Sequence, residues 1–238
     1  MPNAIKTLLI APSAALSDIV NDKGEVDFSL LLPMPKVMED AFAKYDTLYP
    51  TNTIIVRAVN SDTYSHTINL GGREPVIYRG EPLTSLESMT YIEFESFLNW
   101  IAGGGLNGSE WEVPEQHIEQ LNDMLRLKRA TGYSNPLEWR SACWGCKKNA
   151  ETISVKGNEF RILTPNSLPA AWLTALATVH HSARVMVSYV DLDNPASYVG
   201  ELEFEGHKVK ESAPTEHLDE LAEDEQDHWR KVLQKIKG

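Results

Sequence analysis

Residues 150–164 have the sequence AETISVKGNEFRILT, and this stretch decides the fold class. Polar and apolar side chains alternate through 150–155 and again through 159–164, as they do in a strand with one buried face. The residues between them, Lys156-Gly157-Asn158, are typical of a tight turn. The stretch therefore predicts a β-hairpin, and with it an antiparallel pair of strands.

The chain after this hairpin adds a helix and two further strands. We expect the helix to begin at Asn166 or Ser167, with Pro169 in its first turn, because such polar residues cap helices and proline favours the first positions. Two strand-like stretches follow, ARVMVSYV at 183–190 and YVGELEF at 198–204. Strands in runs with a helix between them favour a mainly antiparallel sheet.

The last part of the chain, residues 211–238, is predicted to be a C-terminal helix that is acidic first and basic later, with helical periodicity from Thr215. Acidic side chains near the start of a helix and lysines near its end suit the helix dipole. The apolar residues that recur on one predicted face are Leu218, Ala222, Trp229, Val232 and Ile236.

The N-terminal residues supply the first strand and helix. Residues 5–10 are a short apolar run that predicts a strand, and Ser13 is the expected cap of a helix that ends at Gly24. The segment VDFSLLLPMP, residues 26–35, alternates at first, which predicts a short strand stopped by its two prolines.

The middle of the chain, residues 36–112, is interpreted as an insertion. Its clearest element is a helix with Ser88 as its cap and the glycines at 103–105 as its end. The stretch NTIIVRAV at 52–59 favours a strand, and the glycines and prolines around it favour long loops.

A second helix is predicted from Pro114 to Gly132, and we assign it to the core. Together these elements predict an α+β fold: a ferredoxin-like antiparallel sheet with helices on one face, a long insertion and a C-terminal helix. The core is expected to comprise residues 1–35 and 113–210.

The segment PLEWRSACWGCKKNA, residues 136–150, carries both cysteines, and a helix is expected from Pro136 to near Gly145. Cys143 and Cys146 then lie at the helix C-terminus, whereas a redox pair needs the N-terminus, where the dipole lowers a thiol pKa. A structural zinc would need two further ligands. We expect half-buried fillers, with metal binding and redox chemistry as the alternatives. The tryptophans beside them are more typical of a core than of a base-stacking surface.

Several segments of this chain resemble the YubB ferredoxin-like, Api-type proteins of phages and plasmids. They are VDFSLLLPMP at 26–35, EWRSACWGCKKNA at 138–150 and FRILTPNSLPAAWLTALA at 160–177, in that order. Trp144, Gly145 and Lys147 match a family motif, while Cys146 stands where the family has threonine and Ala4 where it has tryptophan. The resemblance implies a ferredoxin-like fold and an origin in a mobile genetic element, but it implies no reaction.

Composition narrows the classes of function. The formal net charge of −12 argues against general nucleic-acid binding, which needs clustered lysine and arginine, and it permits a basic protein partner. No apolar run approaches the roughly 18–20 residues of a membrane span. Two cysteines in 238 residues favour a reducing compartment over a disulfide scaffold, so the expected location is the cytoplasm of a bacterial host.

Two classes of function remain open. In the first, the chain is a non-catalytic accessory protein of a mobile element, a counter-defence (anti-CRISPR-type) inhibitor that binds a basic host or competitor protein complex such as a ribonucleoprotein. Its contacts would be carboxylates of the acidic run that begins the C-terminal helix, namely Glu220, Glu223 and Glu225.

In the second class, the chain is an enzyme or nucleic-acid-processing module with a site on the sheet face. Trp139, Lys147 and Arg161 are the candidate residues for that surface, and they are also candidate partner contacts. No nucleophile motif, phosphate-binding loop or set of metal ligands is recognised in the sequence. We therefore assign no catalytic, cofactor-binding or metal-binding residue and expect no cofactor.

Overall fold

The computed structural model describes residues 4–43, 45, 52–59, 65–70, 72–87, 89–106, 108–196, 198–205 and 208–237. The chain divides into two compact units, one made of Met1–Met34 with Leu137–Gly238 and the other of Pro35–Pro136. Both units mix helices with antiparallel strands, so the α+β class is confirmed.

The first unit is built on a six-stranded sheet in which each neighbouring pair is antiparallel. Its strands in spatial order are β11 (Lys208–Ser212), β10 (Val199–Glu205), β9 (Arg184–Asp191), β1 (Ala4–Ile10), β8 (Glu159–Pro165) and β7 (Glu151–Lys156). The predicted hairpin is confirmed as β7 and β8, and Gly157 in its turn has a φ of +62°, which glycine adopts without a steric penalty.

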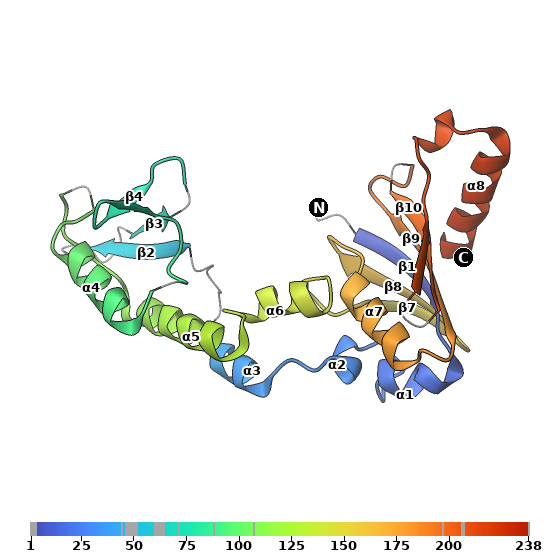
Figure 1. Ribbon diagram of the computed structural model, residues 1–238, viewed down its shortest axis with the longest axis horizontal. Helices are drawn as coiled ribbons and strands as arrows, with labels where there is room; N and C mark the ends of the chain where they lie inside the picture. The colour runs from blue at the N-terminus through green and yellow to red at the C-terminus, as the bar shows by residue number, and fades with distance from the viewer. Residues whose placement is uncertain are drawn as a thin grey trace. The chain divides into compact units, whose positions relative to one another are not determined.

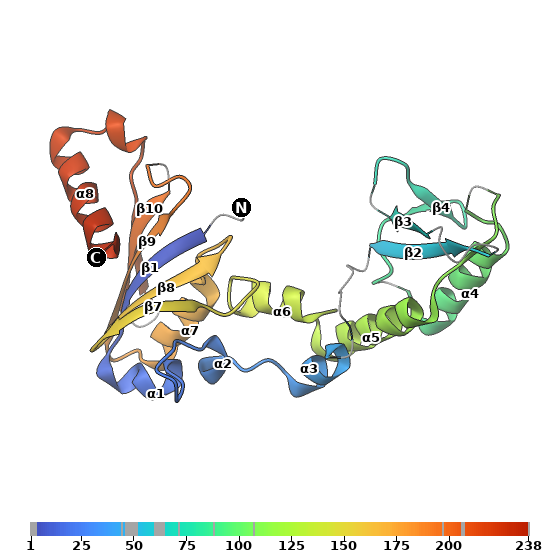
Figure 2. The same cartoon turned by 180° about the vertical axis from the view of Figure 1, so that it is seen from behind.

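Helices cover both faces of this sheet. Figure 1 and the reverse view in Figure 2 show α2 (Phe28–Leu31) and α7 (Ala170–Val179) on one face and α8 (Glu223–Lys237) on the other. α1 (Leu16–Ile19), with a 3₁₀ turn at Ser13–Ala15 before it, and α6 (Pro136–Cys143) complete the helices described in this region. The sequence predicted that the core helices lie on one face of the sheet, and it did not predict which face the C-terminal helix covers.

The two faces of the sheet have different interiors. On the α7 face, Leu9 lies opposite Phe160 and both are fully buried. On the other face, Leu8 packs with Val190 and Val199 against the inner side of α8, which supplies Trp229, Val232 and Ile236. These three α8 residues were predicted as an inner face, whereas Ala222, which precedes the helix, is exposed.

The predicted strand at 26–35 is wrong, because this segment contains the short helix α2. Asp27 caps that helix by accepting a hydrogen bond from the backbone N–H of Ser29, and it accepts another from the amide of Asn149. Burial raises the pKa of Asp27, but these bonds outweigh burial and hold the pKa below its ordinary value. A cap whose partner lies far along the chain overrides the local alternation.

The predicted continuous helix over 211–238 also needs correction. Residues up to Ser212 form β11, which pairs with β10 along its length, and Leu218–Glu220 form a 3₁₀ turn before α8 begins at Glu223. The strand forms because β10 presents a free edge to the segment that follows it. The acidic-then-basic order is confirmed within α8, whose first turn holds three acids and whose last turn holds two lysines.

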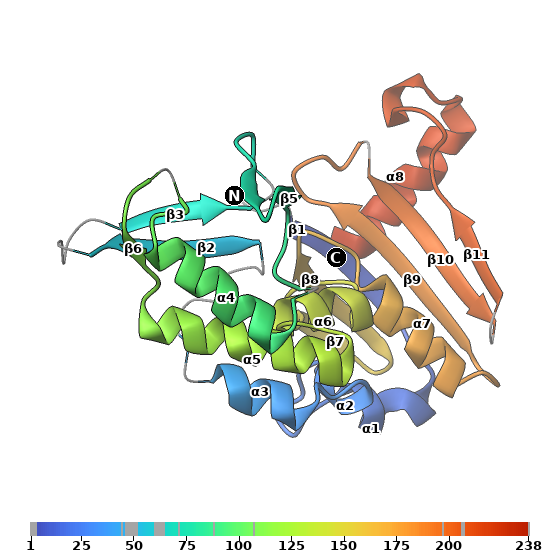
Figure 3. The same cartoon turned by 60° about the vertical axis from the view of Figure 1, so that its left-hand side comes forward.

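In its described residues, the second unit combines short strands with three helices. Its strands are β2 (Thr53–Ala58), β3 (Ser65–Asn69), β4 (Val76–Tyr78), β5 (Glu81–Leu83) and β6 (Trp111–Glu112), and its helices are α3 (Lys36–Phe42), α4 (Tyr91–Ala102) and α5 (Glu115–Thr131). β3, β2 and β6 form one sheet, and β4 and β5 form a separate pair. In Figure 3, α4 and α5 lie on one side of β2 and β3, and the strand predicted at 52–59 is confirmed as β2.

The cap of α4 lies two residues later than the sequence indicated. Its cap is Thr90, which forms a capping box with Glu93, while Ser88 lies outside the described residues. α5 ends at Gly132, as predicted, with a φ of +83°. The second unit extends to Pro136 and so includes α5, which the sequence assigned to the core. Tyr45 donates to Asp123, and the Arg129 guanidinium donates to the Met89 carbonyl, so α5 is bonded within its own unit.

Candidate functional site

The cysteine-containing segment after α6 packs against the start of α7. Trp144 is buried and its indole N–H donates to the Leu32 carbonyl at 2.9 Å. Its ring meets those of Phe28 and Trp139 edge to face, with ring centres 5.8 and 5.6 Å away. Both tryptophans therefore belong to the core, as expected, and no face of Trp144 is left for a stacked base.

Gly145 fits a position that no other residue accepts without distortion. Its φ is +83°, and a Cβ built on it would lie 2.8 Å from the Ala170 backbone nitrogen at the start of α7. The Ser167 hydroxyl donates to the Gly145 carbonyl at 2.7 Å. This segment ends α6 and packs that end against the start of α7, which is a structural role.

The two cysteines are both thiols rather than a disulfide. Cys146 is buried, and its S–H donates to the Lys148 carbonyl at 3.1 Å. Burial raises the pKa of the Cys146 thiol to about 11, so it is protonated at neutral pH, whereas metal binding and redox exchange need the thiolate. Among the described residues, no three metal-ligating side chains lie close enough together to hold a metal ion.

The three residues predicted to share a site on the sheet face do not meet. Trp139 is buried beside Trp144 on the α7 side, and Lys147 is exposed. Arg161 lies opposite Leu8, whose side chain faces α8, so it is on the other face of the sheet. There the buried Arg161 guanidinium donates to the Lys235 carbonyl at 3.0 Å and thereby caps the last turn of α8.

Of the remaining candidates, Glu223 and Glu225 lie in the first turn of α8, and Glu220 lies in the 3₁₀ turn just before it. We call residues 216–227 the acidic segment; every carboxylate in it is exposed. Those carboxylates are Glu216, Asp219, Glu220, Glu223, Asp224, Glu225 and Asp227. Within the described chain, Asp219 pairs with His217 and Asp227 with Arg230, while Glu220, Glu223 and Glu225 form no ion pair.

The fold holds the acidic segment in place. The Gln226 side chain donates to the Leu221 carbonyl at 2.9 Å, and Leu221 is buried in the cluster beneath α8. Acids in the first turn of α8 are stabilised by the helix dipole. The segment therefore presents negative charge from a folded surface rather than from a loose tail.

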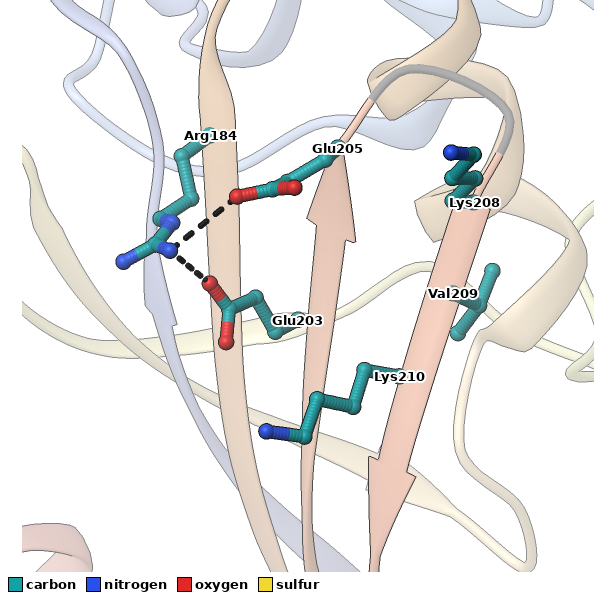
Figure 4. Close-up of a pocket in the computed structure, with 6 residues that line it drawn as sticks. All are labelled: Arg184, Glu203, Glu205, Lys208, Val209 and Lys210. Atoms are coloured by element: carbon teal, nitrogen blue, oxygen red, sulfur yellow. Dashed lines mark hydrogen bonds and ion pairs between the residues drawn. The ribbon is translucent and has the colours of Figure 1, made fainter.

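Sequence reasoning missed a second charged surface, on the α8 side of β9, β10 and β11. This surface lines a depression of about 440 Å³. Figure 4 shows the residues that line it. The Arg184 guanidinium bonds to Glu203 at 2.5 Å and to Glu205 at 3.0 Å. We call the set Arg184, Glu203, Glu205, Lys208 and Lys210 the charged face. Its signal in the sequence is charge at alternate positions in the segments that form β10 and β11, together with the single Arg184 of β9, and this signal gains meaning only once the strand register is known.

The second unit has a depression of about 420 Å³ whose described lining includes His66, Trp100 and Trp111. The Trp100 ring lies over Gly105, where a Cβ would come within 2.2 Å of it. Among the described residues that line it, Glu74 is the one carboxylate. These residues make an aromatic surface, and they include no pair of acids or nucleophile–base pair.

Comparisons with known proteins give no relative. No family model, no curated protein and no solved structure matches this chain. Among the described residues, no helix is both long and apolar enough to cross a membrane. The candidate site therefore depends on the geometry alone.

Proposed function

We propose that this protein is a non-catalytic binding protein whose acidic segment docks onto a basic surface of a protein complex. The observation that carries the proposal is the exposure of seven carboxylates between Glu216 and Asp227, with no lysine or arginine among them. Such a patch attracts a lysine- or arginine-lined surface over a distance of about one screening length, roughly 8 Å at physiological salt.

Three of these seven carboxylates form no ion pair within the described chain, and this supports an external partner. Glu220, Glu223 and Glu225 have no cation beside them in the described chain, although Arg230 and Lys231 follow within the same helix. Because the buried side of α8 is fixed by Trp229, Val232 and Ile236, docking needs little ordering of the backbone. A prearranged patch loses less entropy on binding than a disordered one.

The ferredoxin-like plan belongs to the same proposal. The strand order β9-β1-β8-β7, with helices in the connections from β1 to β7 and from β8 to β9, supports two interleaved β-α-β halves. With the resemblance described above, this favours a protein of phage or plasmid origin that acts in the bacterial cytoplasm. The role we propose is counter-defence, with a nucleic-acid-binding host complex, such as a ribonucleoprotein, as the target.

The test is affinity capture from bacterial lysate with three matched baits. They are the unchanged protein, the variant Glu220→Lys/Glu223→Lys/Glu225→Lys, and a control, Glu95→Lys/Glu110→Lys/Glu115→Lys, which alters exposed glutamates of the second unit. Both variants change the net charge equally.

We expect the unchanged protein and the control to retain the same basic complex, and the acidic-segment variant to lose it. If all three baits retain the complex equally, each with an unchanged circular dichroism spectrum, the acidic segment is not the binding surface. Nuclease treatment before capture tells a protein contact from one bridged by nucleic acid.

A further inference from the structure

The strand β11 forms one edge of the six-stranded sheet, and Figure 3 shows it as the outermost strand. It pairs with β10 in regular register from Lys208 to Ser212, and all its residues are exposed. An edge strand leaves half of its backbone N–H and C=O groups pointing outward, where another strand can pair with them.

The opposite edge, β7, is protected in a way that β11 is not. The pairing of β7 with β8 is interrupted between Thr152 and Ser154, and the Thr152 hydroxyl accepts a bond from the Val26 backbone N–H. Bulges and covering segments of this kind block the addition of a strand. No register shift is recorded between β10 and β11 over their described residues.

Charges alternate in sign across the charged face. Glu205 lies between Arg184 and Lys208, and Glu203 lies beside Lys210 on the same face. Arg184 forms ion pairs with both glutamates, as Figure 4 shows. Neither lysine forms an ion pair within the described chain. At the sheet edge, on β11, the charged face therefore presents two lysine ammonium groups that have no ion-pair partner in the described chain.

We infer that β11 receives a further antiparallel strand from an acidic partner polypeptide, with carboxylates at positions i and i+2 opposite Lys208 and Lys210. Residues two apart in a strand point to the same face, and side chains directly opposite each other have Cβ atoms about 4.5–5.5 Å apart. The added strand would continue the alternation of charge, with backbone bonds along the edge and its carboxylates beside the depression.

The same lysines act against a second copy of this chain. Antiparallel pairing of β11 with β11 of another molecule brings Lys208 or Lys210 opposite a lysine in the well-overlapped registers, and like charges in that position are destabilising. Lysine on an edge strand is a common barrier to self-association. The charge pattern therefore selects an acidic strand and rejects the strand's own copy.

The test uses the whole protein and a labelled peptide of about seven residues, the length of an ordinary strand. The peptide is Thr-Glu-Thr-Glu-Thr-Glu-Thr, and its control, Thr-Glu-Glu-Thr-Thr-Glu-Thr, has the same composition and charge but no two glutamates at positions i and i+2. Binding is followed by fluorescence anisotropy at low salt. We expect the alternating peptide to bind about tenfold more tightly than the control.

Two further comparisons separate strand addition from simple attraction of anions. Lys208→Thr/Lys210→Thr, which keeps strand-forming residues, should reduce binding about tenfold, while Lys148→Thr/Lys156→Thr should leave it unchanged. Methylating the peptide nitrogens at odd or at even positions should abolish binding in one of the two peptides, because a single edge of the peptide pairs with β11.

Equal affinity for the two unmodified peptides, or equal competition by single-stranded DNA of the same charge, would overturn the inference in favour of an unspecific cationic patch. Loss of binding on both methylated peptides, or on neither, would also contradict pairing along one edge. The acidic-segment variant should keep its affinity for the peptide, so this result is independent of the proposed function.

Discussion

The indole nitrogen of Trp144 lies 2.9 Å from the carbonyl oxygen of Leu32, and the two residues are 112 positions apart. Leu32 lies just before the chain leaves the first unit, and Trp144 lies just after it returns. The bond therefore joins the two ends of the inserted unit at one point of the first unit. Closing the ends in this way lets the first unit keep its fold around a long insertion.

We predict that Trp144→Ala destabilises the protein by about 3–5 kcal/mol, because a buried indole leaves a large cavity. Trp144→Phe keeps much of the ring packing and loses the bond to Leu32, so it should cost less. Urea denaturation followed by circular dichroism measures both. A change below about 0.5 kcal/mol in the alanine variant would show that this anchor is unimportant.

Gly145→Ala and Gly24→Ala form a matched pair. Both glycines have a left-handed φ, +83° and +79°, but only Gly145 has a backbone atom within 3.0 Å of a new Cβ. Gly24→Ala should cost about 1–2 kcal/mol from backbone strain alone. Gly145→Ala should cost clearly more, since α7 must move. Equal losses in thermal or urea unfolding would contradict the close approach of α7.

Short-range sequence patterns predicted the elements that are stabilised by residues nearby in the chain. The hairpin of β7 and β8 and the helix α5 follow from alternation, a turn glycine and a terminal glycine. The helix α2 does not, because the Asp27 cap is completed by Asn149. β11 was also missed, since a strand of five exposed residues is defined by its pairing with β10 rather than by burial.

The same distinction applies to the candidate surfaces: one could be predicted from nearby residues and the other could not. The acidic segment is visible in the sequence because its seven acids fall within twelve residues, 216–227. The charged face is not, because Arg184, Glu203 and Lys210 are neighbours only through the register of three strands. Arg161 was assigned to a functional face, but a buried guanidinium beside a helix end is a capping group.

The buried thiol of Cys146 makes the free energy of unfolding depend on pH in the alkaline range. Burial raises its pKa from 9.0 to about 11, so the folded state holds its proton at pH values where the unfolded chain has lost it. The stability from this proton is complete below pH 9 and is lost between pH 9 and 11, by up to about 2–3 kcal/mol. Cys146→Ala should flatten this part of the curve of unfolding free energy against pH. An unchanged slope would contradict the buried thiol.

Arg161→Met should loosen the end of α8. The guanidinium donates to the Lys235 carbonyl, and its loss leaves that carbonyl without the charged donor. We expect faster hydrogen exchange in the last turn of α8, with little change in β8, where methionine fills similar space. Lys6→Met, which removes an exposed donor to Lys237, is the control and should change exchange less. Equal effects would assign no capping role to Arg161.

The most direct test of binding through the acidic segment is the dissociation constant for the captured basic complex, measured against salt. Screening shortens the electrostatic range severalfold between roughly 50 and 500 mM salt. We predict that the unchanged protein binds at least about tenfold more tightly than Glu220→Lys/Glu223→Lys/Glu225→Lys at low salt, and that the difference nearly vanishes at high salt. Affinities that are equal for the two proteins and indifferent to salt would contradict the proposed docking.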